Sequence, residues 1–172
     1  AGLLLIEHLG DEFIIDETRK PIPERYEAAI DTLAAMHELD WPDTVLIAGG
    51  QHHTVPDFDR DAMMIEVSLL SDWYAPRRLG RLLNDDEKSR FEAVWHGLID
   101  ALESAEKTLV QRDYHSPNII WDGTATGTDR TGLIDFKEAM IGPSAYDVAS
   151  LAQDARVDVT ADLESHLLDR YC

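Results

Sequence analysis

Three polar side chains in the second half of the chain have the types and spacing that phosphoryl transfer requires. Asp113 is followed five positions later by Asn118, and Asp135 comes directly after the apolar pair Leu133-Ile134. Mg²⁺ prefers oxygen ligands and usually takes only one or two carboxylates together with phosphate oxygens. Asn118 and Asp135 could therefore supply oxygen ligands to a metal ion on a nucleotide. Asp113 could accept a hydrogen bond from the attacking hydroxyl and orient it.

A small β-hairpin is predicted to carry these side chains at its strand ends. The short apolar stretches 118–121 and 131–134 are typical of strands, and Asp122-Gly123 is typical of the turn that begins a hairpin connection. A further short strand is expected at 108–111, and the residues between it and the hairpin are polar and rich in turn formers. A hairpin is a rigid mount for a catalytic loop.

The rest of the chain is predicted to be mostly helical. Apolar residues at helical spacing predict helices over 24–39, 61–79, 87–107, 145–155 and 161–171. A strand is expected at 3–6, a short apolar stretch follows at 13–15, and loops are expected over 43–56 and 135–143. The fold class is therefore α+β, mainly helical, with a small hairpin.

Composition limits the possible partners. The 172 residues contain 15 Lys and Arg against 34 Asp and Glu, a formal net charge of −19. This balance argues against nucleic acid or an anionic membrane as the main partner, because both require a basic face. The single cysteine, Cys172, fits a reducing compartment, and the opening apolar run is too short for a secretory signal, so a cytoplasmic location is expected.

Three stretches of the sequence, 111–118, 133–136 and 141–147, resemble the C-terminal lobe of the aminoglycoside phosphotransferase/choline kinase family. The resemblance implies a protein-kinase-like C-lobe with a β-hairpin catalytic platform and most of the N-lobe missing. Residues 1–10 would be the last N-lobe strand and the hinge, and residues 11–172 the C-lobe. Within it, 111–118 would be the catalytic loop and 134–137 the metal-binding loop.

The resemblance also implies a kinase that uses ATP and Mg²⁺, with a role for each matching residue. Those roles are the catalytic base or orienting residue for Asp113, magnesium ligands for Asn118 and Asp135, a buried brace of the catalytic loop for Asp147, and adenine contacts for the backbone near Glu7, His8 and Leu9.

Within the family, the stretches 59–74, 112–116 and 135–143 are similar to the sugar kinases of bacterial cell-wall recycling, which phosphorylate N-acetylmuramate and N-acetylglucosamine at the anomeric hydroxyl. Glu66, Tyr114 and His115 would then be substrate contacts. The chain contains no glycine-rich phosphate loop and no strand lysine with a helical glutamate partner. We therefore expect the missing N-lobe of the same protein as a partner, and a fragment that is inactive alone.

Other interpretations remain open from the sequence. The acceptor could be an aminoglycoside or another small alcohol, and the lobe could be a binding module without transfer activity. Asp113 could be a turn-capping carboxylate, Glu66 a solvated residue of a helix, and His115 a hydrogen-bonded loop histidine.

Overall fold

The computed structural model describes residues 7–172, in which helices and short strands alternate. The α-helices are α1 (Pro23–His37), α2 (Arg60–Leu69), α3 (Ala75–Leu79), α4 (Asp85–Asp100), α5 (Ala145–Ala152) and α6 (Ala161–Tyr171). The strands are β1 (Thr44–Ile47), β2 (Gln51–Thr54), β3 (Lys107–Val110), β4 (Ile119–Trp121), β5 (Thr131–Leu133) and β6 (Met140–Pro143). A π-helical turn, η1 (Leu70–Tyr74), joins α2 to α3, and the 3₁₀ turns are η2 (Ser116–Asn118), η3 (Gly127–Arg130) and η4 (Phe136–Glu138). This mixture of helices and strands agrees with the α+β class.

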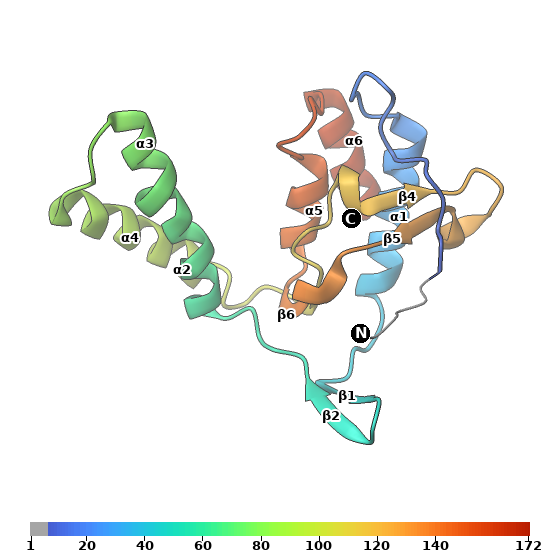
Figure 1. The fold of residues 1–172 in the computed structure, drawn as a ribbon, viewed down its shortest axis with the longest axis horizontal. Helices are drawn as coiled ribbons and strands as arrows, with labels where there is room; N and C mark the ends of the chain where they lie inside the picture. The colour runs from blue at the N-terminus through green and yellow to red at the C-terminus, as the bar shows by residue number, and fades with distance from the viewer. Residues whose placement is uncertain (1–6) are drawn as a thin grey trace, which may run out of the picture.

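The elements form three spatial groups (Figure 1). Helices α1, α5 and α6 lie together with the β4–β5 hairpin in the body. Helices α2, α3 and α4 extend to one side as an arm, and the β1–β2 hairpin projects separately. The active-site candidates that follow β3 and β5 belong to the body, whereas Glu66 belongs to the arm.

The core of the body forms where the apolar stripe of α1 meets α5, α6 and the hairpin. Its buried members are Ile14, Tyr26, Ala29, Ile30, Leu33, Tyr114, Ile119, Val148, Leu151 and Leu167. Burying a leucine or isoleucine side chain contributes roughly 1.5–3 kcal/mol. Because Tyr114 and Ile119 belong to this core, the loop between them is anchored at both ends.

Strands occur in both of the segments predicted to be loops. The segment 43–56 contains the antiparallel pair β1–β2, with Thr44 opposite Thr54, and Gly49 and Gly50 turn the chain at φ values of 84° and 74°. Both strands are exposed throughout, so no buried alternation marked them in the sequence. The segment 135–143 contains β6, which pairs with β3.

The helix predicted over 87–107 is wrong at its end, because α4 stops at Asp100. Residues 101–105 form tighter turns that lead into β3. The helices predicted over 24–39, 61–79, 145–155 and 161–171 are present with shifts of a few residues, and η1 interrupts the second of them. The strand expected at 3–6 lies outside the described residues.

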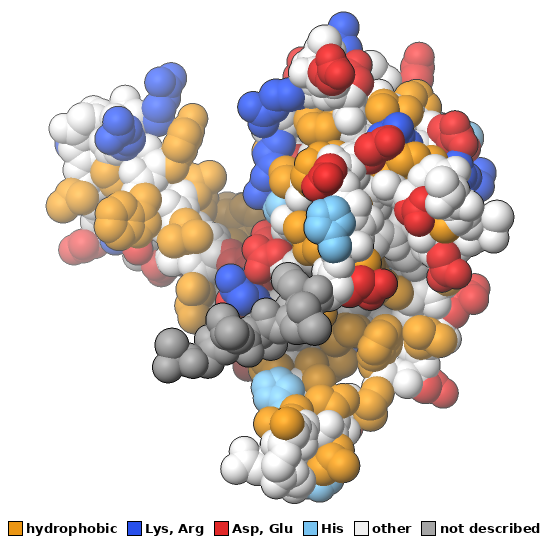
Figure 2. Space-filling view, turned by 45° about the vertical axis from the view of Figure 1, so that its right-hand side comes forward, with side chains coloured by type: hydrophobic (Ala, Val, Ile, Leu, Met, Phe, Trp, Pro, Cys, Tyr) orange, Lys and Arg blue, Asp and Glu red, His pale blue; other side chains and the backbone are white. Residues whose placement is uncertain are grey.

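The arm exposes large apolar side chains, which are visible as orange patches in Figure 2. Its exposed members are Ile65, Leu69, Leu70, Trp73, Tyr74, Leu79, Leu82, Val94 and Leu98. Among the helices of residues 7–172, none is both long and apolar enough to cross a membrane.

Candidate active site

The β4–β5 hairpin brings Asn118 and Asp135 to one end of a two-stranded sheet. Ile119 pairs with Leu133, and the backbone N–H of Ile134 donates to the carbonyl oxygen of Asn118 at 3.1 Å. Asn118 therefore lies at the start of one strand, and Asp135 lies just beyond the end of its neighbour. Asn118 and Asp135 are seventeen positions apart in the sequence, and the antiparallel pairing of β4 with β5 brings them close together in space.

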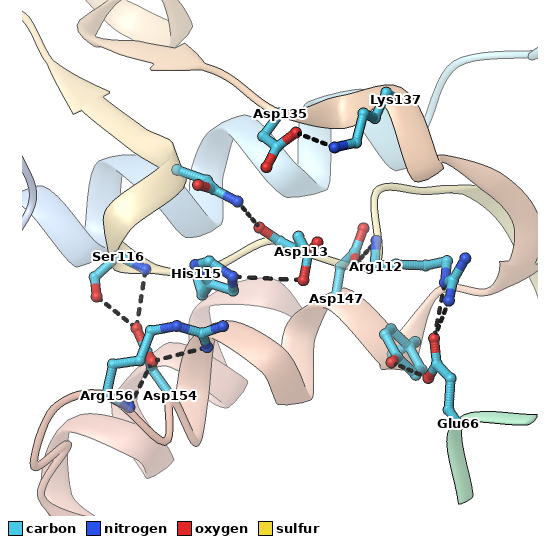
Figure 3. Close-up of polar contacts among 12 residues, drawn as sticks. Glu66, Arg112, Asp113, His115, Ser116, Asp135, Lys137, Asp147, Asp154 and Arg156 are labelled. Atoms are coloured by element: carbon cyan, nitrogen blue, oxygen red, sulfur yellow. Dashed lines mark hydrogen bonds and ion pairs between the residues drawn. The ribbon is translucent and has the colours of Figure 1, made fainter. Parts of the chain in front are cut away.

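Asp135 has a left-handed backbone, with φ of 59° and ψ of 36°. Aspartate tolerates this conformation better than most residues. The left-handed backbone ends the extended strand and turns the Asp135 side chain away from the strand direction. The carboxylate is half-exposed, and Lys137 Nζ lies 3.4 Å from its Oδ1. Figure 3 shows this carboxylate on the side of η4 that faces the segment carrying Asp113.

Asn118 and Asp113 are joined directly. The Asn118 Nδ2 group donates to the backbone carbonyl oxygen of Asp113 at 3.1 Å. This bond uses the nitrogen end of the amide, so the Oδ1 atom is the end that remains for a cation. The Asp113 carboxylate is 47% exposed, and His115 Nε2 lies 3.5 Å from its Oδ1.

Asp147 holds the start of the loop from inside the body. Its Oδ2 accepts the backbone N–H of Gln111 at 2.6 Å, and its Oδ1 accepts that of Arg112 at 2.9 Å. The side chain is fully buried. Burial raises the pKa of Asp147 to about 6 and the nearby Asp113 charge adds to the rise, while the two N–H donors oppose it.

Asp154 holds the end of the same loop, and sequence reasoning missed it. Its carboxylate accepts the backbone N–H of Ser116 at 2.9 Å and the Ser116 hydroxyl at 2.6 Å, and it also accepts the N–H of Arg156 at 2.9 Å. Burial opposes ionisation of Asp154, but these hydrogen bonds and the Arg156 charge outweigh it and lower the pKa. In the sequence, only the position of Asp154 just after the helix that carries Asp147 could have suggested that it binds the same loop.

Two of the predicted substrate contacts lie inside the protein. Tyr114 is 1% exposed, and its hydroxyl donates to the carbonyl oxygen of Ala29 at 2.7 Å. It therefore packs the loop onto α1. His115 is also buried, and its Nδ1 has no hydrogen-bond partner among the described residues, so the side of the ring near Asp113 is the one that makes a polar contact.

Glu66, the third predicted substrate contact, is already paired. Arg112 donates to its Oε1 from Nε at 2.9 Å, and Tyr146 donates to its Oε2 at 2.5 Å (Figure 3). Glu66 lies on the wall of a pocket of about 510 Å³ between the arm and the body. The other lining residues are mostly apolar, namely Phe58, Met63, Val67, Leu70, Trp95, Leu98, Ile99, Leu102, Pro143, Ala145 and Tyr146.

The predicted adenine-contact region lies along the hairpin. His8 and Leu9 line a pocket of about 390 Å³ together with Trp121. Leu9 packs closely on Gly132, where a Cβ atom would lie 2.9 Å from Leu9 Cδ1. Glu7 is exposed and does not line this pocket.

The chain belongs to the phosphotransferase enzyme family, because residues 2–172 match that family. It is 32% identical over 99% of its length to N-acetylmuramate/N-acetylglucosamine kinase of Caulobacter vibrioides, and covers 47% of that protein. Proteins of the same name from Pseudomonas aeruginosa and Neisseria meningitidis are each 29% identical over 99% of this chain, which covers 46% and 48% of them. The chain thus spans about half the length of the curated relatives it matches. These findings confirm the resemblance to the family and to its amino-sugar branch.

Proposed function

We propose that the protein is an ATP-dependent kinase that phosphorylates a hydroxyl of an amino-sugar of the N-acetylmuramate or N-acetylglucosamine type. The observation that carries the proposal is the convergence of Asp113, Asn118 and Asp135 at one end of the β4–β5 hairpin. Phosphoryl transfer depends mainly on positioning and on charge neutralisation, and this hairpin presents groups for both.

The residues present fit a magnesium ion. Asn118 has its amide nitrogen engaged by the Asp113 carbonyl, which leaves an oxygen as its free end, and Asp135 offers a half-exposed carboxylate. An amide oxygen and one carboxylate are the small protein contribution that Mg²⁺ takes when phosphates supply other ligands. The ion would neutralise charge on the phosphates, and Lys137 Nζ, 3.4 Å from Asp135 Oδ1, would help to orient that carboxylate.

Asp113 would orient the acceptor hydroxyl and accept its proton. Its carboxylate is partly exposed, while its backbone is held by Asn118 and its flanks by Asp147 and Asp154. A fixed backbone with an accessible side chain suits a group that must meet a hydroxyl in one direction.

The architecture in this proposal has two lobes. Residues 1–10 would be the last N-lobe strand and the hinge, with the Glu7–Leu9 backbone against adenine, and residues 11–172 would be the C-lobe. The rest of the N-lobe would supply the other half of the nucleotide site. The chain alone would then be inactive, and the kinase would act in the cytoplasm, where ATP is available.

A substrate panel with the full-length parent protein tests this function. Mg²⁺-dependent transfer from ATP would be measured with N-acetylmuramate, N-acetylglucosamine, an aminoglycoside, choline and homoserine. We expect transfer to the two amino-sugars, with loss of the reducing end as the anomeric hydroxyl is phosphorylated. Preference for an aminoglycoside, choline or homoserine would refute the amino-sugar assignment. Binding of Mg·ATP without transfer to any acceptor would favour a binding module.

A further inference from the structure

Glu66 is a single arm residue whose two carboxylate oxygens are both engaged by the body. One oxygen accepts from the Arg112 guanidinium, through Nε at 2.9 Å and through a second, shorter contact with Nη2. The other accepts the Tyr146 hydroxyl at 2.5 Å. The Glu66 side chain is 27% exposed, so these bonds are partly shielded from water.

Arg112 is fixed at both of its ends. Its backbone has a φ of 70°, and its N–H is held by Asp147. Its guanidinium lies 5.1 Å from the centre of the Phe58 ring and 3.9 Å from Glu138, in addition to its bonds with Glu66. Arg112 directly precedes Asp113, so any rotation of its backbone would redirect the Asp113 side chain.

Tyr146 ties the same carboxylate to α5. Burial and the bond to Glu66 raise the pKa of Tyr146, so its hydroxyl stays protonated and remains a donor. Asp147, the next residue, is the one that holds the Gln111 and Arg112 amides. The arm, α5 and the catalytic loop therefore meet at Glu66 (Figure 3).

We propose that Glu66, Arg112 and Tyr146 form a positioning bridge that makes the orientation of Asp113 depend on the placement of the α2–α4 arm. This inference rests on the proposed function. In it Glu66 acts through Arg112 and does not touch the acceptor, which replaces the role predicted from sequence. The pocket of about 510 Å³ shares Glu66 and Tyr146 as lining residues, so a change in the arm beside that pocket reaches the loop through the bridge.

The first test compares Glu66→Gln with Asp72→Asn in the full-length protein. Asp72 is an arm carboxylate that pairs with Lys88 at 2.7 Å, also within the arm, so it controls for loss of one arm charge. Misplacing a reacting group by about 1 Å can cost about 100-fold in rate. We expect Glu66→Gln to lower kcat by about 10- to 100-fold with acceptor KM within about threefold of wild type, and Asp72→Asn to leave both unchanged. A raised acceptor KM with unchanged kcat would instead make Glu66 an acceptor contact and overturn the proposal.

Amide hydrogen exchange of residues 111–116 tests the bridge without relying on activity. We expect Glu66→Gln to speed exchange there by about tenfold relative to Asp72→Asn, since charged hydrogen bonds hold that segment. Unchanged exchange overturns the proposal whatever the kinetics show. Absence of transfer in the wild type would refute the proposed function, and exchange would still decide whether the bridge exists. Tyr146→Phe removes one hydroxyl and should change exchange and kcat in the same direction by a smaller factor, which keeps the test open if Glu66→Gln does not fold.

Discussion

The Asp147 carboxylate accepts the backbone N–H of Arg112 at 2.9 Å, at a position where the Arg112 backbone is left-handed. A non-glycine residue in that region persists only when its surroundings fix it. Asp147 also accepts the N–H of Gln111, so one buried carboxylate holds two consecutive amides of the loop that leads to Asp113. The conformation of the 111–118 loop is therefore determined by α5 as much as by the sequence of the loop itself.

This buried carboxylate gives a specific pH dependence. The pKa of Asp147 is about 6 in the folded chain against a reference value of 3.8, so between these values the folded state keeps a proton that the unfolded state has released. The contribution of Asp147 to stability is fully present below about pH 4 and is lost as the pH rises through about 6, by about 3 kcal/mol in all.

Denaturant unfolding of the wild type and of Asp147→Asn from pH 3.5 to 7 measures this dependence. The difference in free energy of unfolding, wild type minus variant, should decrease as the pH rises. Taking the difference cancels carboxylates common to both proteins. A difference independent of pH would contradict the assignment of a raised pKa to Asp147.

Asp113→Asn in the full-length protein should lower kcat by about 10²- to 10⁴-fold, the usual contribution of a general base. Its stability should change little, because the side chain is 47% exposed. Asp129→Asn, at an exposed position of the hairpin connection, is the matched control. Phosphate transfer and thermal unfolding would be measured together, and an Asp113→Asn enzyme with wild-type turnover would rule out the proposed role.

Asp135→Asn should raise the Mg²⁺ concentration needed for half-maximal transfer by about tenfold or more, because a carboxylate ligand becomes a neutral amide. A Mg²⁺ titration at fixed ATP measures this shift. Lys137→Met is a useful companion, since it removes the cation 3.4 Å from Asp135 without removing a ligand. If Asp135→Asn responded to Mg²⁺ as the wild type does, Asp135 would not be a metal ligand.

Asp154→Ala should destabilise the chain by about 3 kcal/mol or more, because it leaves the buried N–H and hydroxyl of Ser116 without their acceptor. Asp158→Ala, at an exposed position four residues away, provides the comparison. Chemical unfolding of the three proteins reports the difference. Equal stability of the two variants would show that Asp154 does not hold the loop.

Local patterns in the sequence were sufficient for most helices and for the β4–β5 hairpin. The apolar stripe of α1 and the run of α6 from Ala161 to Tyr171 follow directly from helical periodicity. The positions of Asp113, Asn118 and Asp135 in the loops that flank two short strands likewise indicated one site, because antiparallel pairing has few possible registers. Family membership, confirmed over residues 2–172, rests on the same motifs.

Pairings distant in the chain were decided by tertiary structure. Strand β6 exists because β3 lies beside it, and Gly142 permits the approach of Phe58, whose Cβ would lie 2.9 Å from an added Cβ. No local pattern in 135–143 encodes that neighbour. The exposed β1–β2 strands carry no buried alternation, so the sequence did not distinguish them from a loop.

Residue types and order alone specified which side chains could do chemistry, because ligand and base preferences belong to the side chain itself. Which of them are accessible was decided by packing. Tyr114 follows Asp113 in sequence, yet burial against α1 removes it from the surface, and Glu66 is engaged by Arg112 from 46 residues away. Burial and hydrogen-bond partners depend on segments that only the folded chain brings together, so they could not be read from either residue's neighbours in sequence.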